Sequence, residues 1–544
     1  MRVTNVMMTT NMMRNITNNK ADMSKKFDQY ATGQKIQKPS EDPVVAIRSL
    51  KYRANLTELQ QYVDKNIPDA YQWMEITEGA LKNMNELLTG MYYYCTQGSQ
   101  DTYETIDRDK INQNLQQYKE QIYECLNTDN AGRYVFSGYR TDTPACFEEK
   151  TTGQEYEVIE PLTFENLFEK SYVLGGVGAV ANDETILSAD EYKQMAPTKK
   201  EAYCINLSYE NIKSLTELSY EDENGATHYI YSADPNITCD YKLKSVNSTD
   251  PVSAYEIPDK NADGSDYEYD AHFVADTGEL IVSKEVYEKL RSAKSISATY
   301  TKDEFEKGDI RPEMYFNCDV YDLVEDATTG DMVRPVDAIT KKEIGVSYTA
   351  PKEQDIYYEV NFSQKLKVNT MANETLNSSL ARSIDNIMNA VNDAYNTQQK
   401  IDNVKLRLND NSLSEADREA LNVLQEQLET ELVLKQSIVQ ETFSNGMAAV
   451  KEAQDGTKVA DADGTVKKIS VSIANTSLGS RYKRLELIED RLTNQETSFT
   501  EILDKNESVD LEDAIINYNA AEVTYNASLS AASKVVKNSL LDFI

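Results

Sequence analysis

An apolar seam over the last 34 residues, from Leu511 to Ile544, most constrains how this chain can fold. Steps of four and three alternate along it, and seven of its eight positions are apolar: Leu511, Ile515, Tyr518, Glu522, Tyr525, Leu529, Ala532 and Val536. This spacing is typical of a helix that packs against a second helix, and Asp510 is placed to cap its start. The stretch finishes in SLLDFI, so we expect another surface to cover it.

A second seam near the other end keeps the same rhythm, with eight of nine positions apolar: Val63, Ile67, Ala70, Met74, Thr77, Leu81, Met84, Leu88 and Met91. We expect one helix of about 80 Å from Pro43 to Gln97. Pro68 should kink it, because proline removes a backbone hydrogen bond. Ser40 is the expected N-cap, since Pro43 is tolerated in a first helical turn.

The two seams predict that both chain ends meet in one antiparallel helical bundle or coiled coil. They extend beyond what one bundle can bury, so we expect self-association, driven by burial of apolar surface. The predicted assembly residues are Val63, Ile67, Met74, Leu81, Met84, Leu88, Leu511, Ile515, Tyr518, Tyr525, Leu529 and Val536.

The interior of the chain differs from its ends in composition and in residue pattern. Between Lys150 and Val360 lie eight of the twelve prolines and 19 of the 35 tyrosines, among short alternating runs such as THYIYSAD. This pattern is typical of β-strands separated by turns. The fold class is therefore α+β, with a terminal helical bundle and a β-rich inserted outer domain.

Helical spacing returns after the insert. Two apolar stripes flank a polar link in which Ser414 is the expected N-cap, which predicts an antiparallel helical hairpin. We divide the chain into an N-terminal assembly segment (1–42), a helical core (43–147), the β-rich insert (148–362), the hairpin (363–455), a return segment with a core helix (456–510) and a C-terminal assembly helix (511–544).

Composition excludes several classes of function. The formal net charge is −35 at pH 7, which argues against nucleic acid as a partner, because phosphate binding needs a positive face. No run approaches 18 consecutive apolar residues, so no membrane span is expected. The chain carries no nucleophile elbow, phosphate loop or zinc motif, so we expect no enzyme and no catalytic residues. The six scattered cysteines are interpreted as isolated thiols.

One acidic stretch resembles a calcium loop. Asp259, Asn261, Asp263, Ser265 and Asp270 stand at positions 1, 3, 5, 7 and 12 of an EF-hand-like spacing. Against calcium, position 12 is Asp rather than the longer Glu, and an acidic chain produces such runs by chance. We favour a solvated turn and expect no other cofactor.

Three stretches together resemble the flagellin family. They are MRVTNVMMTTNMMRNITNN at the N-terminus, YATGQKIQKPSEDP around residue 36, and NAGRYVFSGYRTDTPAC, in which we expect a short strand at residues 134–136. The motif positions are Gly33, Pro39, Ser40, Asp42, Pro43, Gly132, Arg133, Tyr134, Phe136 and Gly138. The Gly132–Gly138 stretch resembles family members at the hook–filament junction more than filament flagellins. A further stretch, SLGSRYKRLELIEDRL, is similar to the family's return helix.

The resemblance implies an extracellular structural adaptor of the bacterial flagellum, exported by the flagellar type III apparatus. It implies self-association into a ring, with hook-associated protein 1, flagellin and an export chaperone as partners. Two alternatives stay open. One is filament flagellin itself, and the other is a surface-displayed, adhesin-like binding module in the insert.

Overall fold

The computed structural model describes residues 5–100, 103–178, 180–181, 185–248, 254–258, 267–325, 332–337, 342–350, 354–410, 413–460 and 466–541. For residues 535–541 it describes the backbone alone. Terminal helices flank a β-rich middle region, so the predicted α+β fold class is confirmed. Over the described ranges, no helix combines the length and the apolar character needed to cross a bilayer.

The chain divides into two compact units. The first contains Met1–Tyr71, Tyr358–Leu366 and Tyr482–Ile544, and the second contains Gln72–Tyr357 and Lys367–Arg481.

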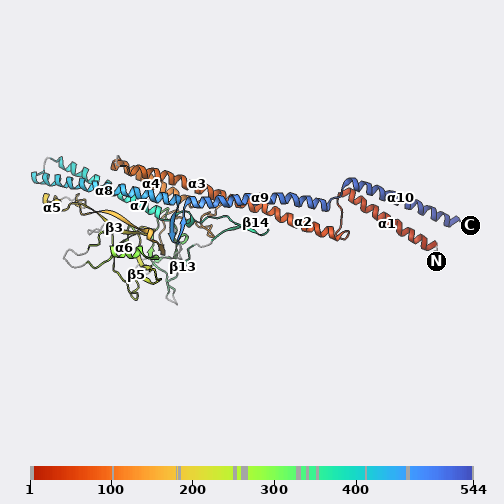
Figure 1. The fold of residues 1–544 in the computed structure, drawn as a ribbon, viewed down its shortest axis with the longest axis horizontal. Coiled ribbons are helices and arrows are strands. Elements are labelled where there is room, and N and C mark those ends of the chain that lie inside the picture. The colour runs from red at the N-terminus through yellow and green to blue at the C-terminus, as the bar shows by residue number, and fades with distance from the viewer. Residues whose placement is uncertain are drawn as a thin grey trace. The chain divides into compact units, whose positions relative to one another are not determined.

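The first unit is built from helices of both chain ends. Helix α1 (Asn5–Thr32) and helix α10 (Leu511–Leu541) lie side by side with the two termini at the same end of the pair (Figure 1). Helix α2 (Pro43–Gln61) contacts the later part of α9 (Val471–Glu507), where Asn506 Nδ2 donates to Ser49 Oγ at 2.8 Å. The predicted pairing of both ends is therefore present within one chain.

The long N-terminal helix is interrupted just before Pro68. A π turn, η1 (Tyr62–Asn66), separates α2 from α3 (Ile67–Gly98), and the Ile67 amide donates to the Tyr62 carbonyl five residues back. A proline ring clashes with the carbonyl four residues earlier and leaves it without its donor. The wider turn lets the helix continue, so the interruption predicted at Pro68 takes this form.

The start of α2 differs from the prediction. Asp42, not Ser40, is the N-cap, and its carboxylate accepts from the amides of Val44 and Val45 at 3.0 and 3.2 Å. Pro43 then takes the first helical position, where its missing N–H costs nothing. The choice of Ser40 was wrong because it placed Pro43 later in the first turn. Asp510 caps α10 as predicted, accepting from Glu512 N at 2.9 Å.

The helical part of the second unit contains α3 from Gln72 onward, α4 (Thr105–Cys125), and the antiparallel hairpin of α7 (Ser379–Leu408) and α8 (Glu415–Asp455). Ser414 caps α8 as predicted, since its hydroxyl accepts from Asp417 N. Helices α3 and α8 approach closely at Gly98, where an added Cβ would lie 2.3 Å from the Phe443 ring. A short hairpin, β16 (Thr457–Ala460) and β17 (Val466–Ile469), leads from α8 into α9.

The insert forms two main sheets. The six-stranded sheet has the order β13 (Val346–Tyr348), β10 (Asn317–Asp322), β1 (Gln154–Leu162), β9 (Ser295–Lys302), β4 (Ser214–Glu221) and β5 (Thr227–Ser232), and every neighbouring pair is antiparallel. The five-stranded sheet has the order β2 (Leu167–Leu174), β3 (Thr198–Asn206), β8 (Glu279–Val282), β7 (Ala271–Val274) and β6 (Leu243–Val246). Its β6–β7 pair is parallel.

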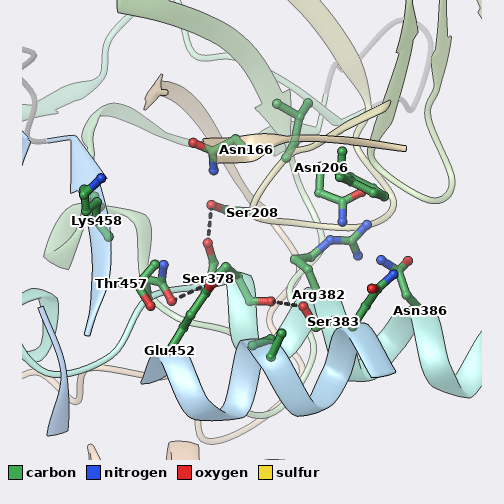
Figure 2. Close-up of a pocket in the computed structure, with 18 of the residues that line it drawn as sticks. Asn166, Asn206, Ser208, Ser378, Arg382, Ser383, Asn386, Glu452, Thr457 and Lys458 are labelled. Carbon is green, nitrogen blue, oxygen red and sulfur yellow. Dashed lines mark hydrogen bonds between the residues drawn. The ribbon is translucent and has the colours of Figure 1, made fainter. Parts of the chain in front are cut away.

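Shorter elements complete the described part of the insert and its exit. They are the 3₁₀ turns η2 (Phe164–Asn166), η3 (Pro312–Met314) and η4 (Ala372–Glu374), the helices α5 (Ala189–Gln194) and α6 (Lys284–Arg291), and two hairpins, β11 (Val324–Glu325) with β12 (Met332–Val333) and β14 (Tyr357–Asn361) with β15 (Gln364–Lys367). A cavity of about 860 Å³ lies in the second unit and is lined by insert strands, α7, α8 and the β16–β17 hairpin (Figure 2).

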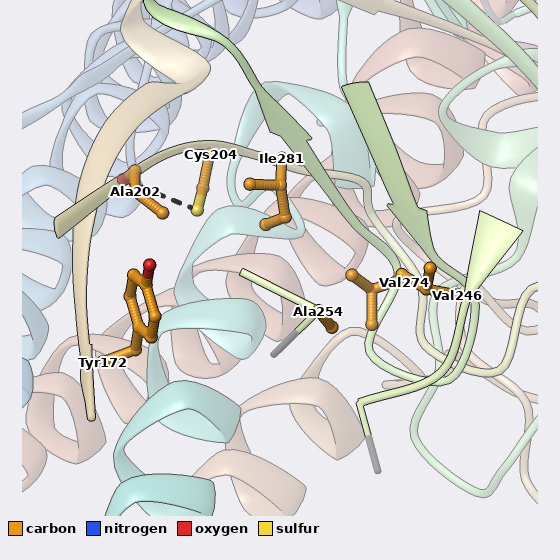
Figure 3. Packing of buried hydrophobic residues seen from close by; sticks show 7 residues of the cluster. All are labelled: Tyr172, Ala202, Cys204, Val246, Ala254, Val274 and Ile281. Atoms are coloured by element: carbon orange, nitrogen blue, oxygen red, sulfur yellow. Dashed lines mark hydrogen bonds between the residues drawn. The ribbon is translucent and has the colours of Figure 1, made fainter. Parts of the chain in front are cut away.

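The five-stranded sheet has its own apolar core (Figure 3). Side chains from five strands meet there, together with Ala254: Tyr172, Ala202, Cys204, Val246, Val274 and Ile281. Ala202 and Cys204 are two residues apart on β3, so both point to the same face of the sheet. All six cysteines of the chain are free thiols, and Cys95, Cys146, Cys204 and Cys318 are buried.

The stretch Gly132–Gly138 is a folded loop and not the short strand predicted at residues 134–136. Its only extended pairing in the described chain is an isolated bridge between Tyr134 and Asp129. Gly132 has a φ of 79°, a left-handed conformation that interrupts a strand. The Phe136 carbonyl accepts from Ala372 N at 2.9 Å, so this loop joins the entry of the insert to its exit.

Candidate functional site

The two terminal helices, α1 and α10, contact each other through a row of small side chains on α10. Ala514 and Ala521 on α10 are only 3% and 9% exposed, and Ser528 and Ala532 continue the same row as half-buried residues. Aromatic rings close one end of the pair, where Tyr518 lies 5.6 Å from Phe27 between ring centroids. Small residues let two helix backbones approach, but they cover little apolar surface.

Large apolar side chains remain uncovered on both helices. On α10, Ile516 and Val523 are 65% and 68% exposed and lie seven residues apart, so they share one row. We call the uncovered residues of the pair the exposed apolar rows: Val6, Met7, Met8, Met13, Phe27, Leu511, Ile515, Ile516, Val523 and Leu529. An uncovered apolar surface of this kind is typical of an interaction site.

The predicted terminal seam divides between these two surfaces. Tyr518 and Tyr525 are half-buried in the row that faces α1, whereas Leu511, Ile515 and Leu529 belong to the exposed apolar rows. The side chain of Val536 lies outside the described residues. Ile516 and Val523 were missed by the sequence analysis, although their seven-residue spacing one position after Ile515 and Glu522 could have revealed them.

The predicted seam of the first long helix lies inside the chain. Ile67, Met74, Leu81, Met84 and Leu88 are fully buried, and Val63 is half-buried. In this conformation the chain's own side chains already cover them. Their predicted role in contacts between subunits stays a prediction.

Helix α1 ends and helix α10 begins at one structural joint, which is formed by residues 33–42 and 507–510. Gly33 ends α1 with a φ of 70°, and its carbonyl accepts from Val509 N at 2.8 Å. Lys35 N in turn donates to the Glu507 carbonyl at 2.7 Å. The motif residues Pro39 and Ser40 lie in the turn that follows, before the Asp42 cap. The motif therefore builds a double connection between the two chain ends.

An ion pair strengthens this joint. The Arg53 guanidinium donates Nε and Nη2 to the two Glu507 carboxylate oxygens at 2.8 and 2.7 Å. The Arg53 hydrogen bond is the main cause that lowers the pKa of the Glu507 carboxyl. A carboxyl with a lowered pKa stabilises the fold above its unfolded pKa, and this stabilisation is lost as the pH falls through the folded value.

We predict that acidification below about pH 4 loosens the joint, and that Glu507→Gln removes this pH dependence. The expected effect is below about 1 kcal/mol, because the Arg53 side chain is 59% exposed and solvent screens the pair. Amide hydrogen exchange at Lys35 and Val509, corrected for intrinsic rates between pH 3 and 6, measures it. Glu501→Gln, on the same helix, is the control. An unchanged pH dependence in Glu507→Gln would contradict the assignment.

The remaining motif residues hold the loop at the insert entry. Arg133 lies over the Trp73 ring at 4.8 Å, and Tyr134 Oη donates to Glu148 at 3.0 Å. Phe136 is buried, and Gly138 has a φ of 62°. These contacts position the chain where the helical core meets the insert.

The calcium hypothesis is not tested by the structure. Asp259, Asn261, Asp263 and Ser265 lie outside the described residues, and Asp270 uses Oδ2 to accept from Lys242 N at 3.0 Å. Within the described ranges, no group of three or more His, Cys, Asp or Glu side chains could hold a metal ion. Calcium binding at this loop therefore stays untested, and the solvated turn stays our prediction.

Residues 3–141 match the protein family described as Bacterial flagellin N-terminal helical region. Over 151 residues the chain is 30% identical to Flagellar hook-associated protein 3 of Escherichia coli K12, an alignment that covers 28% of this chain and 47% of that protein. Over 122 residues it is 29% identical to a flagellin of Clostridium tyrobutyricum, covering 22% of this chain and 32% of that protein.

Among solved structures, the flagellar junction protein FlgL from Legionella pneumophila aligns with 12% identity over 86% of this chain and 100% of that chain, at a TM-score of 0.25. The chain spans about half the length of the curated hook-associated relatives it matches. The resemblance to the flagellin family predicted from the motifs is confirmed by the family match over residues 3–141.

Proposed function

We propose that this chain is a structural adaptor that joins the bacterial flagellar hook to its filament. Its N-terminal region matches the flagellin family model, and a relative in Escherichia coli is named for its association with the hook. The observation that carries the proposal is the pair of terminal helices with its exposed apolar rows. A subunit of a tubular polymer needs such a surface, because burying it against neighbouring subunits drives assembly.

The proposed partners follow from this position. The exposed apolar rows would contact further copies of the chain in a ring, hook-associated protein 1 on the hook side and flagellin on the filament side. An export chaperone would cover the same rows before secretion through the flagellar type III apparatus. The proposed place of action is outside the cell, at the hook–filament junction, and the role is structural rather than enzymatic.

The experiment is immunogold labelling of intact flagella with an antibody raised against the insert. We expect gold at the base of each filament only, and a trace band for this chain beside a dominant flagellin band in sheared filaments. Gold along the whole filament, with this chain as the dominant band, would overturn the junction assignment. That outcome would support the second candidate, filament flagellin, which the similarity to the Clostridium tyrobutyricum protein favours.

A further inference from the structure

The cavity in the second unit is a candidate binding site separate from the exposed apolar rows, since no residue of α1 or α10 lines it. Its walls come from strands of the insert, from the first turns of α7, and from the end of α8 with the β16–β17 hairpin (Figure 2). The Ser208 and Ser378 hydroxyls join two of these walls with a hydrogen bond of 2.6 Å. A volume of about 860 Å³ is in the range of sites for small molecules.

Neutral hydrogen-bonding groups dominate the polar lining. Six asparagines line the cavity: Asn166, Asn206, Asn373, Asn377, Asn386 and Asn445. Serine and threonine hydroxyls lie between them, and Phe168 and Phe316 add aromatic faces. An amide offers donors and an acceptor together, so it matches a ligand whose hydroxyl groups both donate and accept.

Several of these polar groups have no partner in the described part of the chain. Asn206 Oδ1 and Tyr315 Oη are buried without a hydrogen bond. On α7, Arg382 Nε is also buried without one, and Asn386 lies one turn further along the same face. Asn166 Oδ1 accepts a hydrogen bond from the backbone N–H of Thr163 at 2.8 Å, which leaves the Asn166 Nδ2 group to donate to another acceptor. Buried polar groups are normally paired, so these groups point to a ligand.

The most buried charged side chains of the lining already have ion-pair or hydrogen-bond partners within the protein. Arg382, 3% exposed, lies 2.7 Å from the Glu210 carboxylate and also donates to the Thr277 carbonyl. Glu160, 4% exposed, accepts from Ser208 Oγ at 2.6 Å and Tyr300 Oη at 2.7 Å, and burial raises its pKa. Lys170 pairs with Glu279 at 2.6 Å. The other charged side chains of the lining carry both signs, among them Glu441, Lys467 and Lys468, so the lining as a whole favours neither an anion nor a cation.

We propose that this cavity binds a short neutral oligosaccharide. Its hydroxyls would pair with the Asn206, Asn386 and Asn166 amides, and its C–H faces would pack on Phe168 and Phe316. This activity goes beyond the proposed assembly role and does not depend on it, because the cavity and the exposed apolar rows share no residue.

The test is isothermal titration calorimetry of the full chain with maltotriose, cellotriose and chitotriose, beside inorganic phosphate and N-acetyl-trialanine amide. We expect at least one trisaccharide to bind and the other two probes to be silent. Asn386→Leu should weaken the binding about tenfold, which corresponds to about 1.4 kcal/mol. Asn392→Leu, exposed on the same helix and outside the cavity, should leave it unchanged.

Circular dichroism and thermal melting verify that each variant is folded, and Asn166→Ala replaces Asn386→Leu if that variant is not. Three results would overturn the proposal: no trisaccharide binds, the folded cavity variant keeps the parent affinity, or phosphate or the peptide binds where the sugars do not. The immunogold result for the junction is independent of all three.

Discussion

Replacing Ile516 and Val523 together with aspartate is expected to abolish incorporation of the chain into flagella while leaving its fold and its secretion intact. Both side chains are largely exposed in the isolated chain, so two carboxylates there remain hydrated and the monomer loses no packing. On docking, each carboxylate would have to be desolvated or protonated, at a cost of several kcal/mol, on the order of an assembly contact. The measurement is electron microscopy of cells beside a blot of the culture supernatant.

The matched control is Asn517→Asp with Thr524→Asp, which places two carboxylates one position further along α10 without removing an apolar side chain. Both positions are exposed. Cells with the control should carry filaments, whereas cells with the Ile516 and Val523 variant should keep hooks and release flagellin to the medium. Full-length filaments on the latter cells would show that these rows are not an assembly surface. Tyr525 is a poorer target, because it is half-buried facing α1 and its loss would also disturb the pair.

Gly98→Ala is expected to lower the melting temperature of the chain, whereas Gly79→Ala on the same helix should raise it. A Cβ at Gly98 would lie 2.3 to 2.6 Å from three ring atoms of Phe443, which is fully buried and has no room to retreat. Overpacking of this kind costs about 1–3 kcal/mol. A Cβ at Gly79 meets no atom within 4 Å, so alanine should contribute about 1 kcal/mol through helix propensity alone.

Differential scanning calorimetry compares the two variants. Equal shifts in the same direction would show that the contact between α3 and α8 is looser than the structure has it. The pair is informative because the residue change, the helix and the compact unit are the same, so only the local space differs.

Apolar periodicity predicted the helices well because it reports directly on burial. Met74, Leu81 and Leu88 were placed on one seam from spacing alone, and all three are buried. Spacing could not tell whether a chain's own helix or another subunit covers a seam. On α10 the chain's own partner takes the row of Ala514 and Ala521, because small residues allow close approach, and leaves the larger Ile516 and Val523 outside.

Local chemistry explains the errors. Ser40 and Asp42 are both good caps, and only the position of Pro43 in the first turn decides between them. The run at Tyr134–Phe136 has strand-like residues, but glycines with positive φ on either side and the contact of Phe136 with Ala372 hold it as a loop. The cavity could not be predicted, because its polar groups come from residues as far apart as Asn166, Asn386 and Asn445.

The hydrogen bond between Phe136 and Ala372 has a consequence for the length of the insert. Tyr139 N also donates to the Gln354 side chain at 3.2 Å, so the chain leaves the helical core and re-enters it at nearly the same point. The residues between these contacts form one long loop that is closed at its base. The entropic cost of closing a flexible loop grows by only about 0.6 kcal/mol for each doubling of its length. The number of residues in the insert can therefore change at little entropic cost. A foreign domain with neighbouring ends could enter at the same point, but it would lose the native contacts of the insert with α7 and α8, such as the Arg382–Glu210 ion pair.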